Sequence, residues 1–383
     1  MSAARAEQLA IEAPDPPAVQ VDEDHKFLRM SEALVPTGRE IQIVDLFSGC
    51  GGLTLGVMEG ARRSGVSASI ALAVDKESAA LDVLRRTVGE PHERFRQADL
   101  KLLRSVGDAL TPAERTLFGS ARPALLTAGP PCQGHSALNN HTRHDDPRND
   151  LYVSVARAAQ LLEPEVVVIE NVRGVGSDRR GNVDRCAELL EGLGYSVSGR
   201  RLNLVELGAP QRRVRHVLVA AAKDAFKWVL PVHEARTLRW AIGDLLDVEG
   251  TTPFDTASRV HPDNAKRIDW LFESDEDDLP NHLRPKCHHG DHTYRSMYGR
   301  LSWDAPAQTV TSGFGSMGQG RYVHPERRRT LTPHEAARLQ FLPDFARLDG
   351  VTKRGALATL IGNAAPPVLT IALTRALIDQ KLI

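Results

Sequence analysis

Two short apolar runs, each followed at once by a chemically active side chain, constrain this chain more than any other feature. Residues 124–128 read as a buried strand and lead into Gly129-Pro130-Pro131-Cys132-Gln133-Gly134. Residues 166–169 read as a second buried strand and lead into Glu170-Asn171-Val172. Because open α/β sheets bind ligands at the carboxyl ends of their strands, a thiol and a carboxyl group can meet in one crevice. The two runs therefore predict an α/β protein with a cysteine and a glutamate in its active site.

Apolar strands alternate with helical stretches through the first half of the chain. The pattern predicts a glycine-rich turn followed by a helix over 53–63. It predicts strands over 41–46, 70–74, a segment ending near Asp99, 124–128, 166–169 and 214–220. Such alternation is typical of a doubly wound, mostly parallel, Rossmann-like sheet with helices on both faces.

Changes in composition divide the chain into four parts. Residues 1–38, rich in alanine, proline and acidic residues, predict a flexible tail, and residues 39–225 hold the alternating strands and helices of a first domain. Residues 226–330 hold most of the tryptophans and predict a smaller, loop-rich domain. Residues 331–383 predict C-terminal helices. The first of these helices begins with a capping box formed by Thr332 and Glu335, with Pro333 as its first helical residue.

The composition excludes several classes of protein. The chain has 383 residues, 42% of them hydrophobic and 25% charged, which is typical of a soluble globular protein. No apolar stretch approaches the ~20 residues that span a bilayer, and the acidic, proline-bearing start is unlike a secretory signal. The four cysteines lack CxxC spacing, so we expect neither structural zinc nor disulfides. The expectation is a cytoplasmic protein without membrane attachment and without a metal.

The net charge of −1 conceals two basic segments. Five arginines lie between Arg200 and Arg215, and four lie between Arg321 and Arg329. Acidic residues gather instead in 7–24 and in 273–278. This segregation favours a surface that binds a polyanion, with solvated surface charge as the alternative.

The first turn of the predicted sheet, Phe47-Ser48-Gly49-Cys50-Gly51-Gly52, suits a nucleoside-type ligand. Its glycines let the backbone approach the ligand, and Phe47 offers a ring for stacking on a base. Asp75, after the next strand, can accept from ribose hydroxyls, and Asp99 can accept from an adenine amino group. The turn lacks the GxGxxG spacing of dinucleotide folds. A purely structural turn is the alternative.

The residues around the two apolar runs sharpen the chemistry. The prolines before Cys132 pre-form a loop that presents the thiol, although a lone cysteine is more often a buried small hydrophobe. Glu170, just past a buried strand, is costly to desolvate without a partner. Arg213 and Arg215 enter a strand at alternate positions and so face the same side of the sheet. A salt bridge at the sheet edge is the alternative to substrate binding there.

Taken in order, these segments resemble the motif set of the bacterial-type DNA (cytosine-5) methyltransferases, from about residue 41 to residue 375. The matching segments are 45–52, 129–134, 170–172, 211–215, 318–325, 331–340 and 362–364. Small departures occur at His135, where an aromatic residue is common, and at 341–344, after the helix that ends in Gln340. None of them removes a group that the chemistry requires.

The resemblance implies a class I S-adenosylmethionine-dependent methyltransferase fold and S-adenosyl-L-methionine as cofactor. It implies that residues 39–225 are the catalytic and cofactor-binding domain, and that the last helix of residues 331–383 returns to this domain. It implies that Cys132 adds to carbon 6 of cytosine, that Glu170 donates a proton to N3, and that Arg213 and Arg215 hold the base and the glutamate. The cofactor-binding residues implied are Phe47, Ser48, Gly49, Gly51, Gly52, Asp75, Lys76, Asp99, Leu100, Gly129, Pro131, Leu151 and Asn363. The DNA-binding residues implied are Gln133, Ser136, Asn171, Gln211 and Arg321. No metal is implied.

The expected substrate is a cytosine flipped out of double-stranded DNA, with residues 226–330 as the target-recognition domain. The protein is expected to act as a monomer, either beside a restriction endonuclease or as a solitary methylase. Arg321 and residues 327–329 are candidates for phosphate contacts. Cys287, His288, His289 and His292 lack a second ligand pair and are expected at the surface or facing DNA.

Three rival functions remain. Relatives with these motifs methylate tRNA, but the long 226–330 segment favours duplex DNA. A non-catalytic DNA-binding homologue is disfavoured because Cys132, Glu170 and both arginines are present. Enzymes that methylate amino groups of bases carry an aromatic residue after Pro-Pro, where this chain has Cys132.

Overall fold

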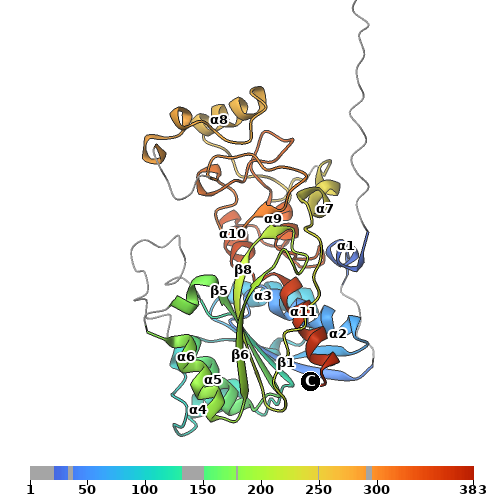
Figure 1. The fold of residues 1–383 in the computed structure, drawn as a ribbon, viewed down its shortest axis with the longest axis vertical. Coiled ribbons are helices and arrows are strands. Elements are labelled where there is room, and N and C mark those ends of the chain that lie inside the picture. The colour runs from blue at the N-terminus through green and yellow to red at the C-terminus, as the bar shows by residue number, and fades with distance from the viewer. Residues whose placement is uncertain (1–20, 33–37, 132–150, 178–179, 249, 290–295) are drawn as a thin grey trace, which may run out of the picture.

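The computed structural model describes residues 21–32, 38–131, 151–177, 180–248, 250–289 and 296–383, and it is built around a seven-stranded sheet. The strand order is β3-β2-β1-β4-β5-β8-β6 (Figure 1). The strands are β1 (Glu40–Leu46), β2 (Ser67–Asp75), β3 (Phe95–Gln97), β4 (Leu125–Ala128), β5 (Val166–Val172), β6 (Ser196–Asn203) and β8 (Val214–Ala221). The first five pair in parallel, and β8 runs antiparallel between β5 and β6. The predicted α/β class, with a doubly wound, mostly parallel sheet, is confirmed.

Strand β6 is the one strand of this sheet that the sequence pattern missed. Only Leu202 of its eight residues is buried, and Arg200 and Arg201 are exposed. The strand lies at the edge of the sheet, where charged side chains protect an open edge from pairing with another chain. A strand that buries so little apolar surface carries no apolar run to detect.

Helices cover both faces of the sheet and enclose two apolar cores. One layer holds α2 (Gly52–Arg63), α3 (Ser78–Val88) and α11 (Pro367–Asp379), and the other holds α4 (Pro112–Phe118), α5 (Leu151–Leu162) and α6 (Asn182–Gly192). Side chains of β1 enter both cores: Ile43 packs in the core that includes α2, and Val44 packs in the core that includes α5. The alternation of side chains along a strand produces this division.

A second body stands beside the sheet, in the upper part of Figure 1. It contains α7 (Leu238–Ile242), α8 (Pro262–Glu273), α9 (Pro333–Leu339) and α10 (Arg354–Asn363), joined by irregular segments. Helix α8 packs into a small core of its own with Leu279, Tyr298 and Val323. Helix α9 begins with the predicted capping box, in which Thr332 accepts from the Glu335 backbone and Glu335 accepts from that of Thr332. A short parallel pair, β7 (Gln211–Arg212) and β9 (Ala307–Gln308), joins the two bodies.

The chain returns to the sheet in α11, which packs against α2. A Cβ atom at Gly56 would lie 2.1 Å from Thr370 Oγ1, and one at Gly60 would lie 2.8 Å from the Ile371 carbonyl oxygen. Only glycine permits this approach. Arg354–Asp379 is long and apolar enough to cross a membrane, with a mean hydropathy of 1.6, but 67% of its apolar window is buried inside the protein. That burial is typical of core helices.

Within residues 1–38, where a flexible tail was expected, the structure describes one short helix. Residues 23–28 form α1 (Glu23–Leu28), capped by the Asp22 side chain, which accepts from the His25 backbone 2.8 Å away. Asp24, Phe27 and Leu28 are buried. The acidic residues and the few apolar residues of this segment are typical of a solvated chain. In the fold, partners distant in the sequence supply the positive charges and the apolar surface against which they are buried.

A buried ion pair links α4 to α5 and gives a stability prediction. Glu114 accepts from Arg157 Nε at 2.9 Å, and both side chains are 2% exposed. Glu114→Gln leaves the Arg157 charge buried without a counter-charge, and we expect it to lower the free energy of unfolding by about 3–5 kcal/mol. Urea unfolding at pH 7 measures the change. Glu163→Gln, whose parent carboxylate is 74% exposed and 4.0 Å from Arg122, is the matched control.

The same pair predicts a pH dependence. The hydrogen bond from Arg157 lowers the pKa of Glu114 from 4.5 to about 2. The carboxylate's contribution to stability is therefore complete above pH 4.5 and is lost as the pH falls toward 2. The difference between wild type and Glu114→Gln should shrink along this range, and a constant difference would contradict the assignment.

Candidate functional site

The candidate site lies where four parallel strands end at the same edge of the sheet. The register aligns Leu46 of β1 with Val74 of β2 and with Ala128 of β4, which in turn aligns with Ile169 of β5. The residues that follow these aligned positions are Phe47, Asp75, Gly129 and Glu170. The fold thus brings together the glycine loop, the Pro-Pro loop and the acid that the sequence singled out.

Asp75 holds the glycine loop in place. Its Oδ2 accepts from the Gly49 backbone at 2.8 Å, and its Oδ1 accepts from the Glu77 backbone at 2.9 Å. Gly51, the N-cap of α2, has φ 95°, and a Cβ atom there would lie 2.3 Å from Leu84 Cδ1. The loop therefore needs glycine at this position, both for its backbone and for its packing.

Two further features of this loop are typical of a ligand site. Phe47 has φ 57°, a left-handed conformation that is uncommon for residues other than glycine and that clusters at functional sites. Ser48 is buried, and its Oγ forms no hydrogen bond within the part of the chain that the structure describes. A buried hydroxyl without a partner is costly, so it indicates an external acceptor or donor. The backbone N–H groups at the start of α2 lie in the same turn and favour an anionic group.

The C-terminal part of the chain closes over the glycine loop. A Cβ atom at Gly52 would lie 2.0 Å from the Ala365 carbonyl oxygen, so the two segments are in direct backbone contact. Cys50 Sγ lies 3.6 Å from the Leu360 carbonyl oxygen on the same side. Asn363, exposed at the end of α10, is two residues from Ala365 and so lies close to the loop.

The remaining cofactor candidates surround the end of β2. The Ala98 backbone donates to the Asp75 carbonyl oxygen at 3.0 Å, which sets Asp99 beside Asp75. Burial tends to raise the pKa of Asp99, but hydrogen bonds from Lys101 and the charge of Lys76 outweigh it and lower the pKa. Leu100 is buried, Lys76 is exposed, and Leu151 begins α5 as a buried residue.

Glu170 and Arg215 form the central ion pair of the site. Arg215 Nε lies 2.6 Å from Glu170 Oε1, and both side chains are about 10% exposed. The antiparallel register of β5 and β8 sets Val172 opposite Arg215 and Glu170 opposite Val217, so the two charged side chains share a face. Arg215 compensates the cost of burying the carboxylate.

The acid lies against the Pro-Pro loop. A Cβ atom at Gly129 would lie 3.9 Å from Glu170 Oε2, and Asn171 Nδ2 donates to the Pro130 carbonyl oxygen at 3.1 Å. Asn171 thus fixes the loop through its side-chain amide. Pro131 is the last described residue before Cys132, and Cys132, Gln133 and Ser136 lie outside the described residues.

Gln211, expected to contact DNA, has a different role in the structure. It is 0% exposed, and its Nε2 donates to the Leu339 carbonyl oxygen at 2.7 Å and to Gln340 Oε1 at 2.6 Å. Its Oε1 accepts from the Val310 backbone at 3.0 Å. Gln211 therefore joins the sheet body to the second body from inside.

Arg213 shares the face of Arg215 but reaches other groups. Its Nη1 donates to the Val310 carbonyl oxygen at 2.9 Å and its Nη2 to that of Ala364 at 3.5 Å. These contacts hold the end of the second body and the C-terminal segment beside the site. The side chain is buried, as is Arg215.

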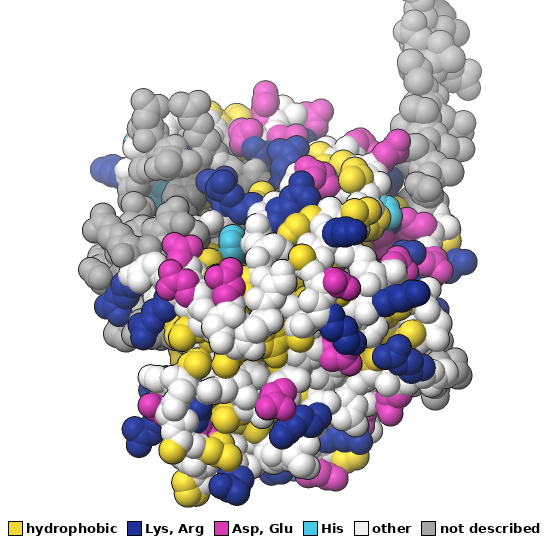
Figure 2. Space-filling model, turned by 60° about the horizontal axis from the view of Figure 1, so that its bottom comes forward, with side chains coloured by type: hydrophobic (Ala, Val, Ile, Leu, Met, Phe, Trp, Pro, Cys, Tyr) yellow, Lys and Arg dark blue, Asp and Glu magenta, His cyan; other side chains and the backbone are white. Residues whose placement is uncertain are grey.

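The arginines expected to bind phosphate are paired within the protein. Arg321 donates to Asp278 and to the carbonyl oxygens of Asp277 and Arg300 at 2.9 and 3.0 Å. The other three arginines of this segment also have acidic partners: Arg327 with Asp247, Arg328 with Asp269 and Arg329 with Glu335. On the face shown in Figure 2, basic and acidic side chains are interspersed. The arginines of the 321–329 run thus each have an acidic partner in the same chain, with Arg327 and Arg328 half exposed.

The thiols and histidines within the described residues do not form a metal site. There, no group of three or more His, Cys, Asp or Glu side chains is placed to hold an ion. The His288 ring packs edge-on against Tyr298, with centroids 5.2 Å apart. Burial raises the pKa of Cys50 and of Cys186 to about 12, so neither thiol is suited to attack at neutral pH.

Asp45, a buried residue that holds two loops of the site together, was not singled out by the sequence analysis. Asp45, fully buried, accepts from Thr54 Oγ1 at 2.5 Å and from Thr127 Oγ1 at 2.8 Å. It thereby links β1 to the first turn of α2, which follows the glycine loop, and to β4, which precedes the Pro-Pro loop. An aspartate in an otherwise apolar strand is the sequence signal that could have revealed it.

Comparisons with known proteins agree on one family. The model of the family "C-5 cytosine-specific DNA methylase" matches residues 41–379. The Type II methyltransferase M1.BsuMI of Bacillus subtilis (strain 168) is 40% identical over 356 residues, covering 91% of this chain and 83% of its own. The Type II methylase M.HgiDII of Herpetosiphon aurantiacus is 32% identical over 344 residues, covering 85% and 92%.

Solved structures share the fold at lower identity. The S. pombe Dnmt2 methyltransferase superposes with a TM-score of 0.59 at 16% identity, covering 89% of this chain and 99% of its own. At such identity the likeness supports the architecture alone.

The buried Asp45 generates a prediction on pH. Burial raises its pKa from 3.8 to about 7, against hydrogen bonds from Thr54 and Thr127 that lower it. Its contribution to stability is complete below pH 3.8 and is lost as the pH rises through about 7. Asp45→Asn removes this titration, so the stability of the variant relative to wild type should improve between pH 5 and pH 8.

Chemical unfolding at several pH values measures this difference. Asp349→Asn, which changes an exposed aspartate, should show no such trend. A stability difference for Asp45→Asn that does not vary with pH would refute the assignment.

Proposed function

Because the chain belongs to the C-5 cytosine-specific DNA methylases and is therefore a DNA (cytosine-5-)-methyltransferase, we propose that it acts through a covalent bond between Cys132 and carbon 6 of the base. The base is a cytosine flipped out of duplex DNA, and the methyl donor is S-adenosyl-L-methionine. The observation that carries the proposal is the buried Glu170–Arg215 pair beside Gly129 and Pro130, the residues that lead into Cys132.

The chemistry needs these groups because carbon 5 of cytosine is a weak nucleophile. The Cys132 thiolate adds to carbon 6, and N3 of the ring takes a proton from Glu170. Carbon 5 becomes an enamine carbon and forms the new bond to the methyl group. S-adenosyl-L-methionine supplies that methyl group as a sulfonium. As that bond forms, the bond from the methyl group to sulfur breaks, and the donor would leave as a neutral thioether. Water takes the proton from carbon 5, and the electrons of that C–H bond expel the Cys132 thiolate from carbon 6. The N3 proton returns to Glu170, which regenerates the enzyme.

The arginines support this step in two ways. Arg215 orients the Glu170 carboxyl group and balances its charge at 2.6 Å, which keeps the acid pointing into the site when no base is present. Arg213 keeps the Val310 segment and the Ala364 segment against the site through their carbonyl oxygens. We propose that the two arginines also hold the exocyclic oxygen of the flipped base.

The glycine loop fits the cofactor. The hydroxyl of Ser48, without a partner in the described structure, and the N–H groups at the start of α2 suit the carboxylate of the methionine part. Asp75 suits the ribose hydroxyls, and Asp99 with Leu100 suits the adenine. Phe47, held in a left-handed conformation, offers a ring to stack on the adenine. The other residues proposed to bind the cofactor are Lys76, Gly129, Pro131, Leu151 and Asn363.

The remaining parts of the proposal concern partners. Residues 226–330 would read the DNA word, with Gln133 and Ser136 touching the flipped nucleotide. The protein would work as a monomer in the bacterial cytoplasm. A restriction endonuclease with the same recognition word would be its functional partner, as the Type II names of its relatives suggest.

The covalent step predicts the behaviour of Cys132→Ser. Methyl transfer to duplex DNA should fall by ~10³-fold or more, because the ring is no longer activated, while binding of cofactor and of DNA persists. Wild type with an oligonucleotide carrying 5-fluorocytosine should give a trapped adduct on denaturing gels, and Cys132→Ser should give none.

Cys186→Ser changes a buried thiol in α6 and is the matched control. Unimpaired turnover in Cys132→Ser, or equal methylation of tRNA and DNA by wild type, would overturn the proposal.

The acid gives a second, graded prediction. Glu170→Gln keeps the shape of the side chain but removes the proton donor, so turnover should fall by about 10²–10⁴-fold. Glu165→Gln, at the other end of the same strand, should leave turnover unchanged.

The cofactor assignment predicts that Ser48→Ala weakens S-adenosyl-L-methionine binding. The expected rise in Kd is about 2- to 12-fold, the equivalent of one neutral hydrogen bond. Isothermal titration with the cofactor measures it, with Ser120→Ala, at an exposed serine, as control. An unchanged Kd would show that the Ser48 hydroxyl has no part in the cofactor site.

A further inference from the structure

A short segment near the N-terminus touches both bodies of the protein. We name residues 22–30, which contain α1, the N-terminal clasp. In Figure 1, α1 lies to the side of the molecule between α7, in the second body, and α2, beside the sheet. No part of the methylation chemistry described above uses it.

Asp24 anchors the clasp to the sheet body. Its Oδ1 accepts from Arg63 Nη1, at the end of α2, at 2.5 Å. Arg63 in turn lies 2.7 Å from Glu59, one turn earlier in the same helix. All three side chains are nearly buried, with 5–6% exposed. The pairing therefore fixes the clasp on the helix that starts at the glycine loop.

The same carboxylate also binds the second body. Asp24 Oδ2 lies 2.6 Å from Arg236 Nη1, and Arg236 Nη2 lies 2.7 Å from Asp22. At the other end of the clasp, Arg29 pairs with Asp244 at 2.5 Å and donates to the Trp240 carbonyl oxygen at 3.0 Å. Asp24 is thus shared between an arginine of the sheet body and one at the entrance to the second body.

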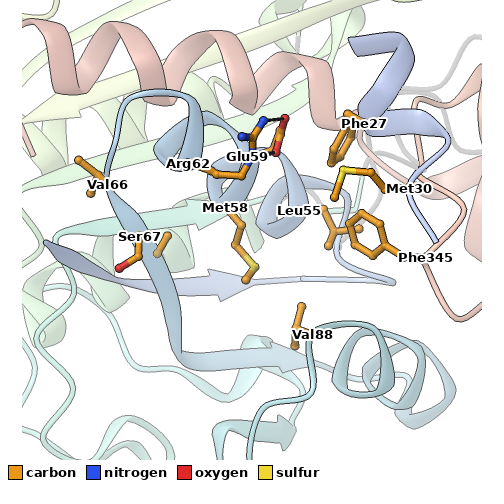
Figure 3. A pocket seen from close by; sticks show the side chains of 11 residues that line it. Phe27, Met30, Leu55, Met58, Glu59, Arg62, Val66, Ser67, Val88 and Phe345 are labelled. Atoms are coloured by element: carbon orange, nitrogen blue, oxygen red, sulfur yellow. Dashed lines mark hydrogen bonds and ion pairs between the residues drawn. The ribbon is translucent and has the colours of Figure 1, made fainter. Parts of the chain in front are cut away.

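Apolar side chains of the clasp pack against both bodies, between its two sets of ion pairs. Phe27 stacks on Phe341 with centroids 6.2 Å apart and meets Phe345 edge-on at 6.0 Å. Figure 3 shows Phe27 and Met30 pointing toward Leu55 of α2 and toward Phe345, at one end of a pocket lined largely by apolar side chains. The backbone of Asp344 donates to the Leu28 carbonyl oxygen at 2.9 Å. The segment after α9 and the helix α2 therefore meet on the same clasp.

We propose that the N-terminal clasp is a positioning element for DNA, and that Asp24 is its key positioning residue. By joining Arg63 to Arg236, it holds the second body at the angle over the sheet edge at which both bodies grip one duplex. This inference rests on the proposed function. The ion pairs and ring contacts of the clasp reach the end of α2, the region of α7 and the segment after α9, so it acts on productive DNA binding and not on the chemical step.

Asp24→Asn in the full chain tests the proposal. The amide replaces a carboxylate that two arginines share, so Arg63 keeps Glu59 and Arg236 keeps Asp22 as a close acidic partner, and no charge joins the two arginines. We expect the KM for duplex DNA to rise about 10-fold, with kcat and the Kd for S-adenosyl-L-methionine within about 2-fold of wild type, because only the relative placement of the bodies changes. Methylation at near-cognate sites should increase relative to the cognate site.

Glu23→Gln is the matched control. It removes the same charge from the neighbouring position of α1, where the carboxylate is 65% exposed and 3.8 Å from Arg63. KM, kcat and site preference should stay at their wild-type values. A rise in KM as large as that of Asp24→Asn would overturn the role assigned to the Asp24 bridge.

A second variant keeps the test decisive if Asp24→Asn folds poorly. Arg29→Gln breaks the other end of the clasp at a partly exposed pair, and it too should raise the KM for DNA while cofactor binding persists. The proposal is overturned if kcat and cofactor affinity fall together with DNA affinity in either folded variant, or if KM is unchanged in both. If the wild-type protein methylates no DNA, the proposed function is wrong. Failure of the clasp proposal can therefore be distinguished from failure of the proposed function.

Discussion

Parallel pairing of β1 with β2 and β4, and of β4 with β5, keeps the ends of these strands level. The glycine loop, the Pro-Pro loop and Glu170 all start from that line. Asp45 reinforces it from inside, since one carboxyl group binds a threonine of α2 and a threonine of β4. A displacement of one strand by one residue would turn its side chains to the other face and separate the glycine loop from Glu170.

Several buried charges of the described structure have a partner of opposite sign beside them. Glu170 has Arg215, Glu114 has Arg157, and Asp24 has two arginines. An unpaired buried charge is costly, so each pair depends on the fold that brings its members together. The two pairs of Asp24 also help to place the two bodies of the protein relative to each other.

That placement rests on buried polar contacts across the junction. Gln211 and Gln340 are both fully buried, and Gln340 Nε2 donates to the Ile361 carbonyl oxygen at 2.7 Å. Arg213 adds bonds to Val310 and Ala364 on the inner side, and the N-terminal clasp adds ion pairs on the outer side. Since each such group is costly to leave unpaired, the junction favours one arrangement over a range of them.

The sequence by itself determined the sheet class, most of its strands, the capping box of α9 and the residues of the glycine loop, because these depend on apolar runs and on turn chemistry that are local in the chain. Motif order also identified the family. The sequence could not show which groups Gln211, Arg321 and Asp24 contact, since these partners lie 21 to 212 residues away and no local pattern points to them. Nor could it reveal β6, which buries a single side chain. Only the tertiary structure decided these points, because a polar side chain takes its role from whichever partner the fold sets beside it.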